Sequence, residues 1–320
     1  MPRLAWLAVA AACGASSVKK PSAPGWTALA PMLSGQGEAA AAALDGKIYL
    51  AGGYDTHRAL QIYDTATGAW TAGPLLPAGT DNAGATAYGG KIYLVGGEAA
   101  LRLQIYDPAA NSWSAGPELP SPRFSSSVEL IDAQVHVAGG WSFDRSNNVS
   151  IATHDAFDLA AGSWITGKAP MKTARNHAVS GVIGGKLYVV GGRGPGHEAE
   201  DASNLASVEV YDPPADAWTD LAPLPTPRSG GAAAVLDGKL YVLGGGLPGN
   251  TVYKTIERFD PATGAWEKLD DMPVAITGHR AVAVGTSLYV MGGFTSNDGQ
   301  RTGFAGVSDC WRYDPPHLDP

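Results

Sequence analysis

Cysteine, charge and long apolar runs are all scarce in this chain. Cys13 and Cys310 are the only cysteines among 320 residues, and no Cys and His residues follow a metal-binding spacing. Charged residues make up 16%, the formal net charge is -8, and no basic block occurs, which argues against a surface that follows nucleic-acid phosphates. No apolar run is long enough to span a bilayer. The sequence therefore predicts no metal site, no cofactor and no nucleic-acid partner.

Glycine is abundant, at 42 residues, and its pairs mark an internal repeat. A short apolar run that ends in Gly-Gly, KIYLAGG from Lys47 to Gly53, returns five more times at intervals of 43 to 53 residues. The later copies begin at Lys91, Gln134, Lys186, Lys239 and Ser287. A period of this size is the signature of a repeat architecture. Each copy has the β-branched and aromatic content of one buried strand.

An aromatic residue followed by Asp forms a second marker in every unit. The six pairs are Tyr63-Asp64, Tyr106-Asp107, Phe157-Asp158, Tyr211-Asp212, Phe259-Asp260 and Tyr313-Asp314. In five units a tryptophan follows seven positions later, and we expect it to pack between strands: Trp70, Trp113, Trp164, Trp218 and Trp266. Gly-Gly, aromatic-Asp and the spaced tryptophan together resemble the kelch motif over roughly residues 24–314. The resemblance implies an all-β fold, a six-bladed kelch β-propeller whose blades are four-stranded antiparallel meanders.

The sixth unit reaches Tyr313-Asp314 without a following tryptophan, and the matching piece stands at the other end of the chain. The segment WTALAPM, which begins at Trp26, parallels WTDLAPL at Trp218. We therefore predict that the strand around Trp26 supplies the outer strand of the last blade. Such a strand closes the ring of blades and leaves no unpaired end.

The first residues differ in composition from the repeats. A positive residue and a short Ala-rich apolar stretch precede Cys13, as in an export signal, and Ala10–Cys13 is similar to a bacterial lipobox. Lipidation of Cys13 would be the chain's membrane attachment; cleaved secretion and an uninformative start are the alternatives. We divide the chain into a signal-like segment (1–13), a flexible tether (14–24), one propeller domain (25–314) and a C-terminal tail (315–320). This predicts an exported protein, either a periplasmic or outer-membrane lipoprotein or a secreted one.

Length variation among the units is confined to one type of connection. In a meander of strands a to d, the a–b and c–d turns lie on one face of the ring and the b–c and d–a loops on the other. In four units the a–b turn is a tight Asp-Gly or Gly-Gly pair such as Asp45-Gly46, whereas the b–c loops of units 3 to 6 are long. Variable loops on a rigid scaffold commonly carry function, so we expect binding on the b–c/d–a face.

Arginine occupies one register position, 12 residues before the Ile48 position, in three consecutive units: Arg123, Arg175 and Arg228. Planar guanidinium groups suit a carboxylate or phosphate ligand. The alternative is packing, because a loop arginine in kelch proteins often bonds carbonyl groups of the adjacent blade. Two positions further on, six residues are expected to face the mouth of the central channel: Glu38, Asn82, Ser125, His177, Gly230 and Gly278. We count Glu38 and Asn82 among the candidate ligand contacts.

The long loops of units 3 and 4 hold the remaining candidates. Arg193 begins the unit 4 loop and would contact a ligand, and Glu198 in the same loop would act with His177 as an acid–base pair. A solvated acidic loop is the alternative for Glu198. Trp141 begins the unit 3 loop and offers an aromatic face to a sugar ring or a peptide side chain, unless it packs its own loop.

Two functions from different classes fit these residues. The first is a binding module that holds a protein or an acidic carbohydrate over its loop face. It is favoured because the chain has no nucleophile motif such as G-x-S-x-G. The alternative is a cofactor-independent sugar isomerase similar to the N-acetylneuraminate mutarotases, which are exported kelch propellers. An enzyme should enclose a pocket with a perturbed carboxyl or imidazole, whereas a binding module should present aromatic anchors.

Overall fold

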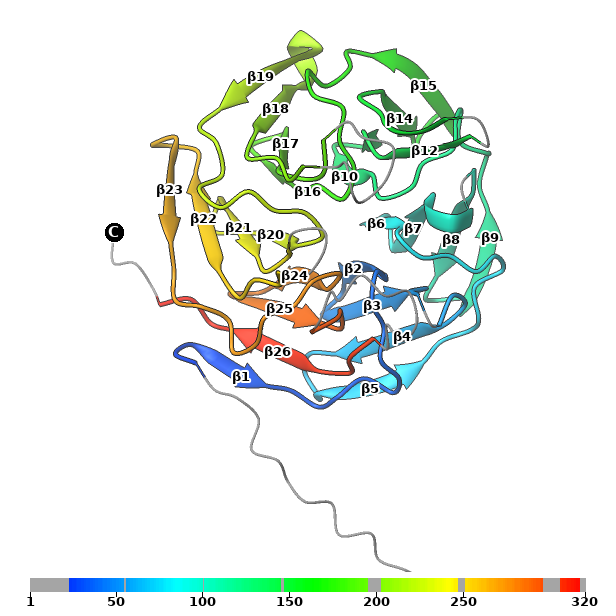
Figure 1. Ribbon diagram of the computed structural model, residues 1–320. Helices are drawn as coiled ribbons and strands as arrows, with labels where there is room; N and C mark the ends of the chain where they lie inside the picture. Colours follow the sequence, from blue (N-terminus) through cyan, green and yellow to red (C-terminus); the bar gives the residue numbers. More distant parts are fainter. Residues whose placement is uncertain are drawn as a thin grey trace, which may run out of the picture.

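Six four-stranded antiparallel sheets stand in a ring around a central axis, as Figure 1 shows. This computed structural model describes residues 23–54, 56–99, 101–144, 147–194, 203–246, 251–295 and 306–316. Helix within these ranges is limited to two short 3-10 turns, η1 (Gly97–Ala99) and η2 (Pro213–Ala215). The all-β, six-bladed propeller expected from the repeats is confirmed.

Each blade runs outward from an innermost strand that lines the axis. Blade 1 consists of β2 (Ala40–Leu44), β3 (Lys47–Ala51), β4 (Leu60–Asp64) and β5 (Ala69–Ala72). Blade 2 consists of β6 (Gly84–Tyr88), β7 (Lys91–Val95), β8 (Leu103–Asp107) and β9 (Ser112–Ala115). Blade 3 consists of β10 (Ser127–Ile131), β11 (Gln134–Ala138), β14 (His154–Asp158) and β15 (Ser163–Lys168).

The second half of the ring repeats this order. Blade 4 consists of β16 (Val179–Ile183), β17 (Lys186–Val190), β18 (Val208–Asp212) and β19 (Ala217–Leu221). Blade 5 consists of β20 (Ala232–Leu236), β21 (Lys239–Leu243), β22 (Ile256–Asp260) and β23 (Ala265–Lys268). Blade 6 consists of β24 (Arg280–Val284), β25 (Ser287–Met291), β26 (Cys310–Tyr313) and the N-terminal strand β1 (Trp26–Ala28).

The strand β1 closes the ring as predicted. It pairs antiparallel with β26, with Trp26 opposite Tyr313, and Figure 1 shows the blue β1 beside the red β26. The two rings stack with centroids 4.8 Å apart. The same aromatic–Trp pairing joins the two outer strands of the other blades, at centroid separations of 5.0 to 5.2 Å. Trp26 therefore replaces the tryptophan that the sixth unit lacks.

The repeated tryptophans also connect neighbouring blades, as their fixed register suggested. Each of the five donates its indole N–H to a backbone carbonyl of the preceding blade or its connection; Trp218, for example, reaches Ala169 O at 2.8 Å. The aromatic ring thus packs within its own blade while its N–H bonds the preceding one. Because both roles are structural, these residues are not available as a ligand platform.

The Gly-Gly pairs, which directly follow the second strand of each blade, connect that blade to the following one. The N–H of each second glycine donates to a carbonyl of the following blade, as from Gly192 to Arg228 O at 2.9 Å. A Cβ on the first glycine, Gly191, would lie 2.6 Å from that same carbonyl oxygen, and its φ is +62°. The pair is therefore needed both for its positive φ and for the close approach of two blades.

One long connection differs from expectation. The segment from Trp141 to Ser150, expected to be a loop, forms a hairpin of its own, β12 (Trp141–Asp144) paired with β13 (Asn147–Ser150). A connection of this length lets its two arms pair, which satisfies backbone groups that an open loop leaves to water. The hairpin rises from blade 3 on the b–c face.

The signal-like segment, Cys13 and most of the expected tether and tail lie outside the described residues. Glu198 also lies outside them. Across the ranges that are described, no helix is long and apolar enough to cross a membrane.

Candidate functional site

Six residues form a closed ring of backbone hydrogen bonds at one end of the central channel; we call this ring the collar. Each backbone N–H donates to the carbonyl of its counterpart in the preceding blade, at 2.7 to 3.1 Å. The members are those expected at the channel mouth, Glu38, Asn82, Ser125, His177, Gly230 and Gly278. All six have positive φ, between 49° and 64°. Four are not glycine, and such strained backbone concentrates at functional sites.

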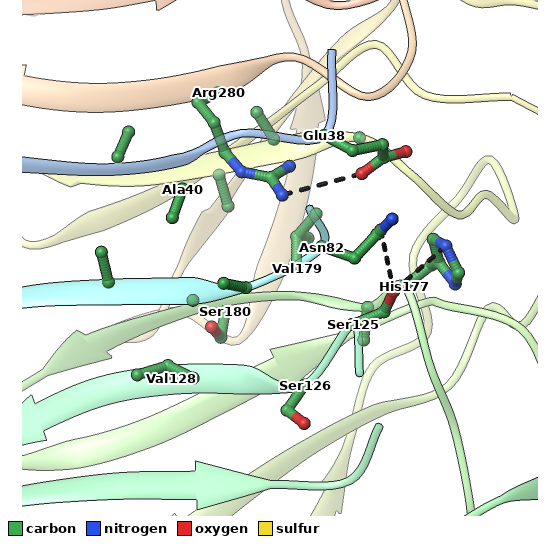
Figure 2. Close-up of a pocket in the computed structure, with 18 of the residues that line it drawn as sticks. Glu38, Ala40, Asn82, Ser125, Ser126, Val128, His177, Val179, Ser180 and Arg280 are labelled. Carbon is green, nitrogen blue, oxygen red and sulfur yellow. Dashed lines mark hydrogen bonds and ion pairs between the residues drawn. The ribbon is translucent and has the colours of Figure 1, made fainter. Parts of the chain in front are cut away.

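The collar surrounds the entrance to a cavity of about 150 Å³ along the axis. Small residues of the innermost strands, such as Ala40, Gly84 and Ala232, line much of its wall. Charged and polar side chains gather at the mouth, where Figure 2 shows Glu38, Asn82, Ser125, His177 and Arg280 around one space. Because the residues of the wall are small, a cavity remains at the axis. The polar side chains at the mouth determine which ligands can enter it.

Glu38 of the collar forms a charged pair with Arg280, the first residue of β24. The Arg280 guanidinium lies 3.7 Å from Glu38 Oε2 and donates to the carbonyl of His279 at 3.0 Å. Burial raises the pKa of Glu38, and the positive charges of Arg280 and Arg193 oppose that rise. The 3.7 Å separation leaves Arg280 loosely held, so its guanidinium is able to serve a ligand as well.

On the opposite side of the mouth, a chain of hydrogen bonds joins three collar side chains. Ser125 Oγ donates to Asn82 Oδ1 at 2.9 Å and lies 3.2 Å from His177 Nε2 (Figure 2). The other imidazole nitrogen, Nδ1, contacts Asn176 Oδ1. Burial, followed by the charges of Arg193 and Arg280, lowers the pKa of His177 well below 6.5. His177 is therefore neutral at pH 7, with its ring fixed at both nitrogens.

A second carboxyl lies deeper in the channel. Glu129, on β10, accepts a hydrogen bond at 2.8 Å from Ser180 Oγ on β16 of the neighbouring blade, and both residues line the cavity. Burial raises the pKa of Glu129 to about 7, which the bond from Ser180 opposes. A carboxyl with such a pKa exchanges a proton near neutral pH.

Arg193 lies above the collar, and among the described residues its guanidinium has one side-chain hydrogen-bond partner, Ser229. Backbone bonds to Asn176, at 2.8 and 3.2 Å, fix its position directly after the Gly-Gly pair of blade 4. Its Nε donates to Ser229 Oγ at 3.2 Å, and none of the described carboxylates lies within ion-pair distance. Burial lowers the pKa of Arg193, and the charge of Glu38 raises it. The described mouth thus has a guanidinium ready for an anion.

Arg193 is one of six residues that directly follow a Gly-Gly pair; we call these six residues the rim, and three of them are aromatic. The residues that directly follow the Gly-Gly pairs are Tyr54, Glu98, Trp141, Arg193, Gly246 and Phe294. Trp141 packs edge-on against Phe124 at 6.2 Å, and Phe294 packs edge-on against Tyr54 at 6.3 Å. Phe124 also meets the His177 ring at 6.5 Å. Trp141 is partly exposed, so it packs its own blade and still offers a face to solvent.

The three register arginines are buried inside their blades, which corrects their expected part in the ligand site. Arg175 donates to Gly191 O at 2.9 Å, to Ser207 O at 2.8 Å and to Glu209 Oε1 at 2.5 Å. Both side chains of this ion pair are fully buried. Because its donors are used inside the blade, Arg175 has none free for an anion.

Arg228 and Arg123 follow the same pattern. Arg228 donates to two carbonyls and to Glu257, and Arg123 to Thr153 and Asp155. These contacts support the packing interpretation, with the difference that each arginine bonds its own blade rather than the adjacent one. The sequence held the signal: an acidic residue stands second in the strand that ends in aromatic-Asp in units 3, 4 and 5, where the arginines occur, and in no other unit.

Of the other expected site residues, the structure brings together Glu38, Asn82, His177 and Arg193. Trp141 stands nearby on the rim. Sequence reasoning missed Arg280 and Glu129, which belong to innermost strands and not to loops. Their signal was a charged residue in strands otherwise built from small and apolar residues.

Comparison with known proteins agrees with the geometry. The KLHDC2/KLHL20/DRC7 Kelch-repeats domain model matches residues 85–293, more than half of the chain, and a Kelch motif model matches residues 37–74. The chain belongs to the kelch-repeat family. In a solved kelch-like neighbour, titled "Structure of YjhT", the TM-score is 0.75 at 18% identity, over 88% of this chain and 95% of that one. At this identity the likeness shows the fold alone.

Curated relatives match over shorter stretches. An F-box/kelch-repeat protein of Arabidopsis thaliana is 38% identical over 101 residues, which is 31% of this chain and 25% of that protein. Kelch-like ECH-associated protein 1A of Danio rerio is 34% identical over 96 residues (30% and 16%). The influenza virus NS1A-binding protein homolog of Mus musculus is 43% identical over 77 residues (24% and 11%). The alignments span a quarter or less of each relative.

Proposed function

We propose that this kelch propeller is a binding module that seats a carboxylate of its partner at the channel mouth on the b–c/d–a face. The observation that carries the proposal is Arg193, a partly buried guanidinium with no carboxylate partner among the described residues. Its neighbours strengthen the choice of ligand, since the charges of both Arg193 and Arg280 act on Glu38, the carboxylate of the collar, while His177 is neutral. A ligand carboxylate that enters here meets two guanidinium groups, which form charge-assisted hydrogen bonds with carboxylates.

The rim around Arg193 supports a protein or peptide as the partner. Trp, Tyr and Arg are the residues that most often dominate the energy of protein interfaces. Trp141 and Tyr54 stand on this rim with Arg193, and Tyr54 is 38% exposed. One relative is named for binding another protein. We infer that an acidic segment lies across the rim and directs one carboxylate into the mouth.

The test compares peptides that differ in charge alone. A hexaglutamate peptide should raise the melting temperature of the propeller and a hexaglutamine peptide should not, since a ligand of the native state stabilises it by mass action. Arg193→Met should abolish most of the shift. The matched control is Lys268→Met at the exposed end of β23, which changes net charge equally on an outer strand.

An equal loss in both variants would mean that general charge attraction, and not the mouth, holds the peptide. Equal shifts in melting temperature with the two peptides would show that binding does not depend on the ligand's carboxylate groups. Either result contradicts a site centred on Arg193.

A second candidate, the mutarotase-like isomerase, is favoured by one specific feature. The cavity is lined by two carboxyl groups of raised pKa, Glu38 at the mouth and Glu129 deeper in the channel, and by the neutral imidazole of His177. Ring opening and closing of a carboxylated sugar needs a proton donor and a proton acceptor, and Arg193 would hold the sugar's carboxylate. Anomer exchange of N-acetylneuraminate, followed by NMR, should then be accelerated and should be lost in Glu38→Gln. No acceleration over the spontaneous rate would exclude this function.

We also propose that the chain is exported, on the strength of its signal-like first 13 residues and the lipobox-like sequence that ends at Cys13. Fractionation of cells that express the full chain tests this. The wild type should appear in the membrane fraction and Cys13→Ser should leave it; an unchanged cytoplasmic distribution of both would contradict export.

A further inference from the structure

A second cluster of polar side chains lies at the junction of blades 1 and 2, on the same face as the mouth. His57 comes from the b–c loop of blade 1, Asp81 from the segment that enters β6, and Glu98 from the rim of blade 2. One potential ligand atom from each lies within 4.8 Å of the other two. The sequence separates them by up to 41 positions, so no spacing motif reveals them.

Backbone hydrogen bonds fix these three residues relative to one another. The carbonyl of His57 accepts from Thr80 N at 2.8 Å, which places the loop of blade 1 against the residue before Asp81. Glu98 N donates to Asp81 O at 3.0 Å. The backbone positions of the three residues are therefore fixed by the fold, and their proximity does not depend on side-chain conformation alone.

Asp81 is the member that most needs a positive partner. It is 6% exposed, and its carboxylate receives one long side-chain hydrogen bond, from Asn82 Nδ2 at 3.4 Å. Glu98 places a second carboxylate in the same cluster. Burying a carboxylate beside a second one is costly unless a cation compensates both.

The distances and donor types fit a metal ion. His57 Nδ1 is 3.0 Å from Glu98 Oε2, yet makes no hydrogen bond of acceptable geometry, so the two atoms do not point directly at each other. Two bonds of ~2.1 Å that meet at a right angle on one ion put their donor atoms ~3.0 Å apart. The His57 and Glu98 side chains are both exposed enough to turn and shorten the longer separations. One imidazole and two carboxylates suit first-row divalent ions better than Ca²⁺.

We propose that His57 Nδ1 and the carboxylates of Asp81 and Glu98 bind one first-row divalent metal ion. The ion joins the b–c loop of blade 1 to the rim of blade 2. Because Asp81 also holds the collar residue Asn82, the ion orders one side of the channel mouth. This site is separate from the anion site at Arg193 and does not depend on it.

Mn²⁺ alone is the probe. Full-length protein freed of metal with EDTA is titrated with MnCl₂, and bound Mn²⁺ is followed by loss of the free-ion EPR signal. We expect one ion per chain and a pulsed-EPR coupling to one imidazole nitrogen. His57→Ala should remove that coupling, and both His57→Ala and Glu98→Gln should weaken binding more than tenfold.

Controls separate binding from folding. The His57 and Glu98 side chains are 43% and 59% exposed, so both variants should keep the metal-free melting temperature of the wild type. Glu118→Gln, an exposed carboxylate outside the cluster, should bind Mn²⁺ normally. No saturable binding up to millimolar Mn²⁺, or wild-type affinity in both cluster variants, overturns the proposal.

Discussion

Replacing Arg175 with methionine should destabilise the propeller sharply, because it leaves a buried charge behind. Glu209 would keep its carboxylate at a fully buried position, with bonds from the backbone N–H groups of Lys172 and Thr173 but with no cation. Removing one partner of a buried ion pair typically costs about 3–5 kcal/mol. With an unfolding entropy of about 2.1 cal/mol/K per residue over about 290 residues, this corresponds to a fall of roughly 5–8 °C in melting temperature.

A double-mutant cycle isolates the cause. In the Arg175→Met background, Glu209→Gln removes the unpaired charge while an amide oxygen still accepts backbone hydrogen bonds, so it should restore part of the lost stability. In the wild-type background the same Glu209→Gln change should destabilise. Urea unfolding followed by tryptophan fluorescence gives both free energies, provided that the slope with denaturant is unchanged. An Arg175→Met variant within about 1 kcal/mol of the wild type would refute the reasoning and return Arg175 to the list of ligand contacts.

Three further perturbations test other parts of the fold. Trp26→Ala removes the stacked ring that closes blade 6 and should cost about 3–5 kcal/mol in a denaturant titration; a loss below about 1 kcal/mol would deny β1 its closing role. Gly191→Ala and Gly185→Ala both meet a positive φ, but at Gly185 nothing lies within 4 Å of an added Cβ, whereas at Gly191 a carbonyl oxygen lies at 2.6 Å. Gly191→Ala should therefore lower the melting temperature more, and equal effects would deny the close blade contact. For Glu129, burial raises the pKa from 4.5 to about 7, so the folded state holds this proton longer than the unfolded state and loses stability as pH rises from 4.5 to 7. Glu129→Gln should thus match the wild type near pH 4 and melt higher above pH 7; a constant difference across that range would contradict the shift.

The repeat markers were enough to predict the ring, because each is tied to a contact that every blade must make. Gly-Gly gives the inter-blade hydrogen bond, and the aromatic residue with its tryptophan gives the packing between the two outer strands. Trp26 was assigned correctly because it carries the same local sequence as Trp218. Local sequence patterns of this kind therefore predict the contacts that occur in every blade.

The collar could also be predicted, since its register is constant from unit to unit. Its chemistry could not be predicted in full, because that depends on which side chains of neighbouring blades approach one another. Arg280 approaches Glu38 from the last blade, and Ser180 approaches Glu129 from the next blade along the chain. The register also placed Arg175 near the mouth. The register alone does not take account of the acidic residue in the third strand of the same blade, Glu209, which holds Arg175 inside the blade.

The measurement that tests the central claim most directly is a fluorescence titration of hexaglutamate against the wild type, Arg193→Met and Lys268→Met at two salt concentrations. Loss of charge-assisted hydrogen bonds worth about 1.5–3 kcal/mol predicts a roughly tenfold to hundredfold weaker affinity for Arg193→Met. Lys268→Met should bind as the wild type does at both salt concentrations. Equal binding by all three proteins would show that the channel mouth is not the site where the propeller holds an acidic partner.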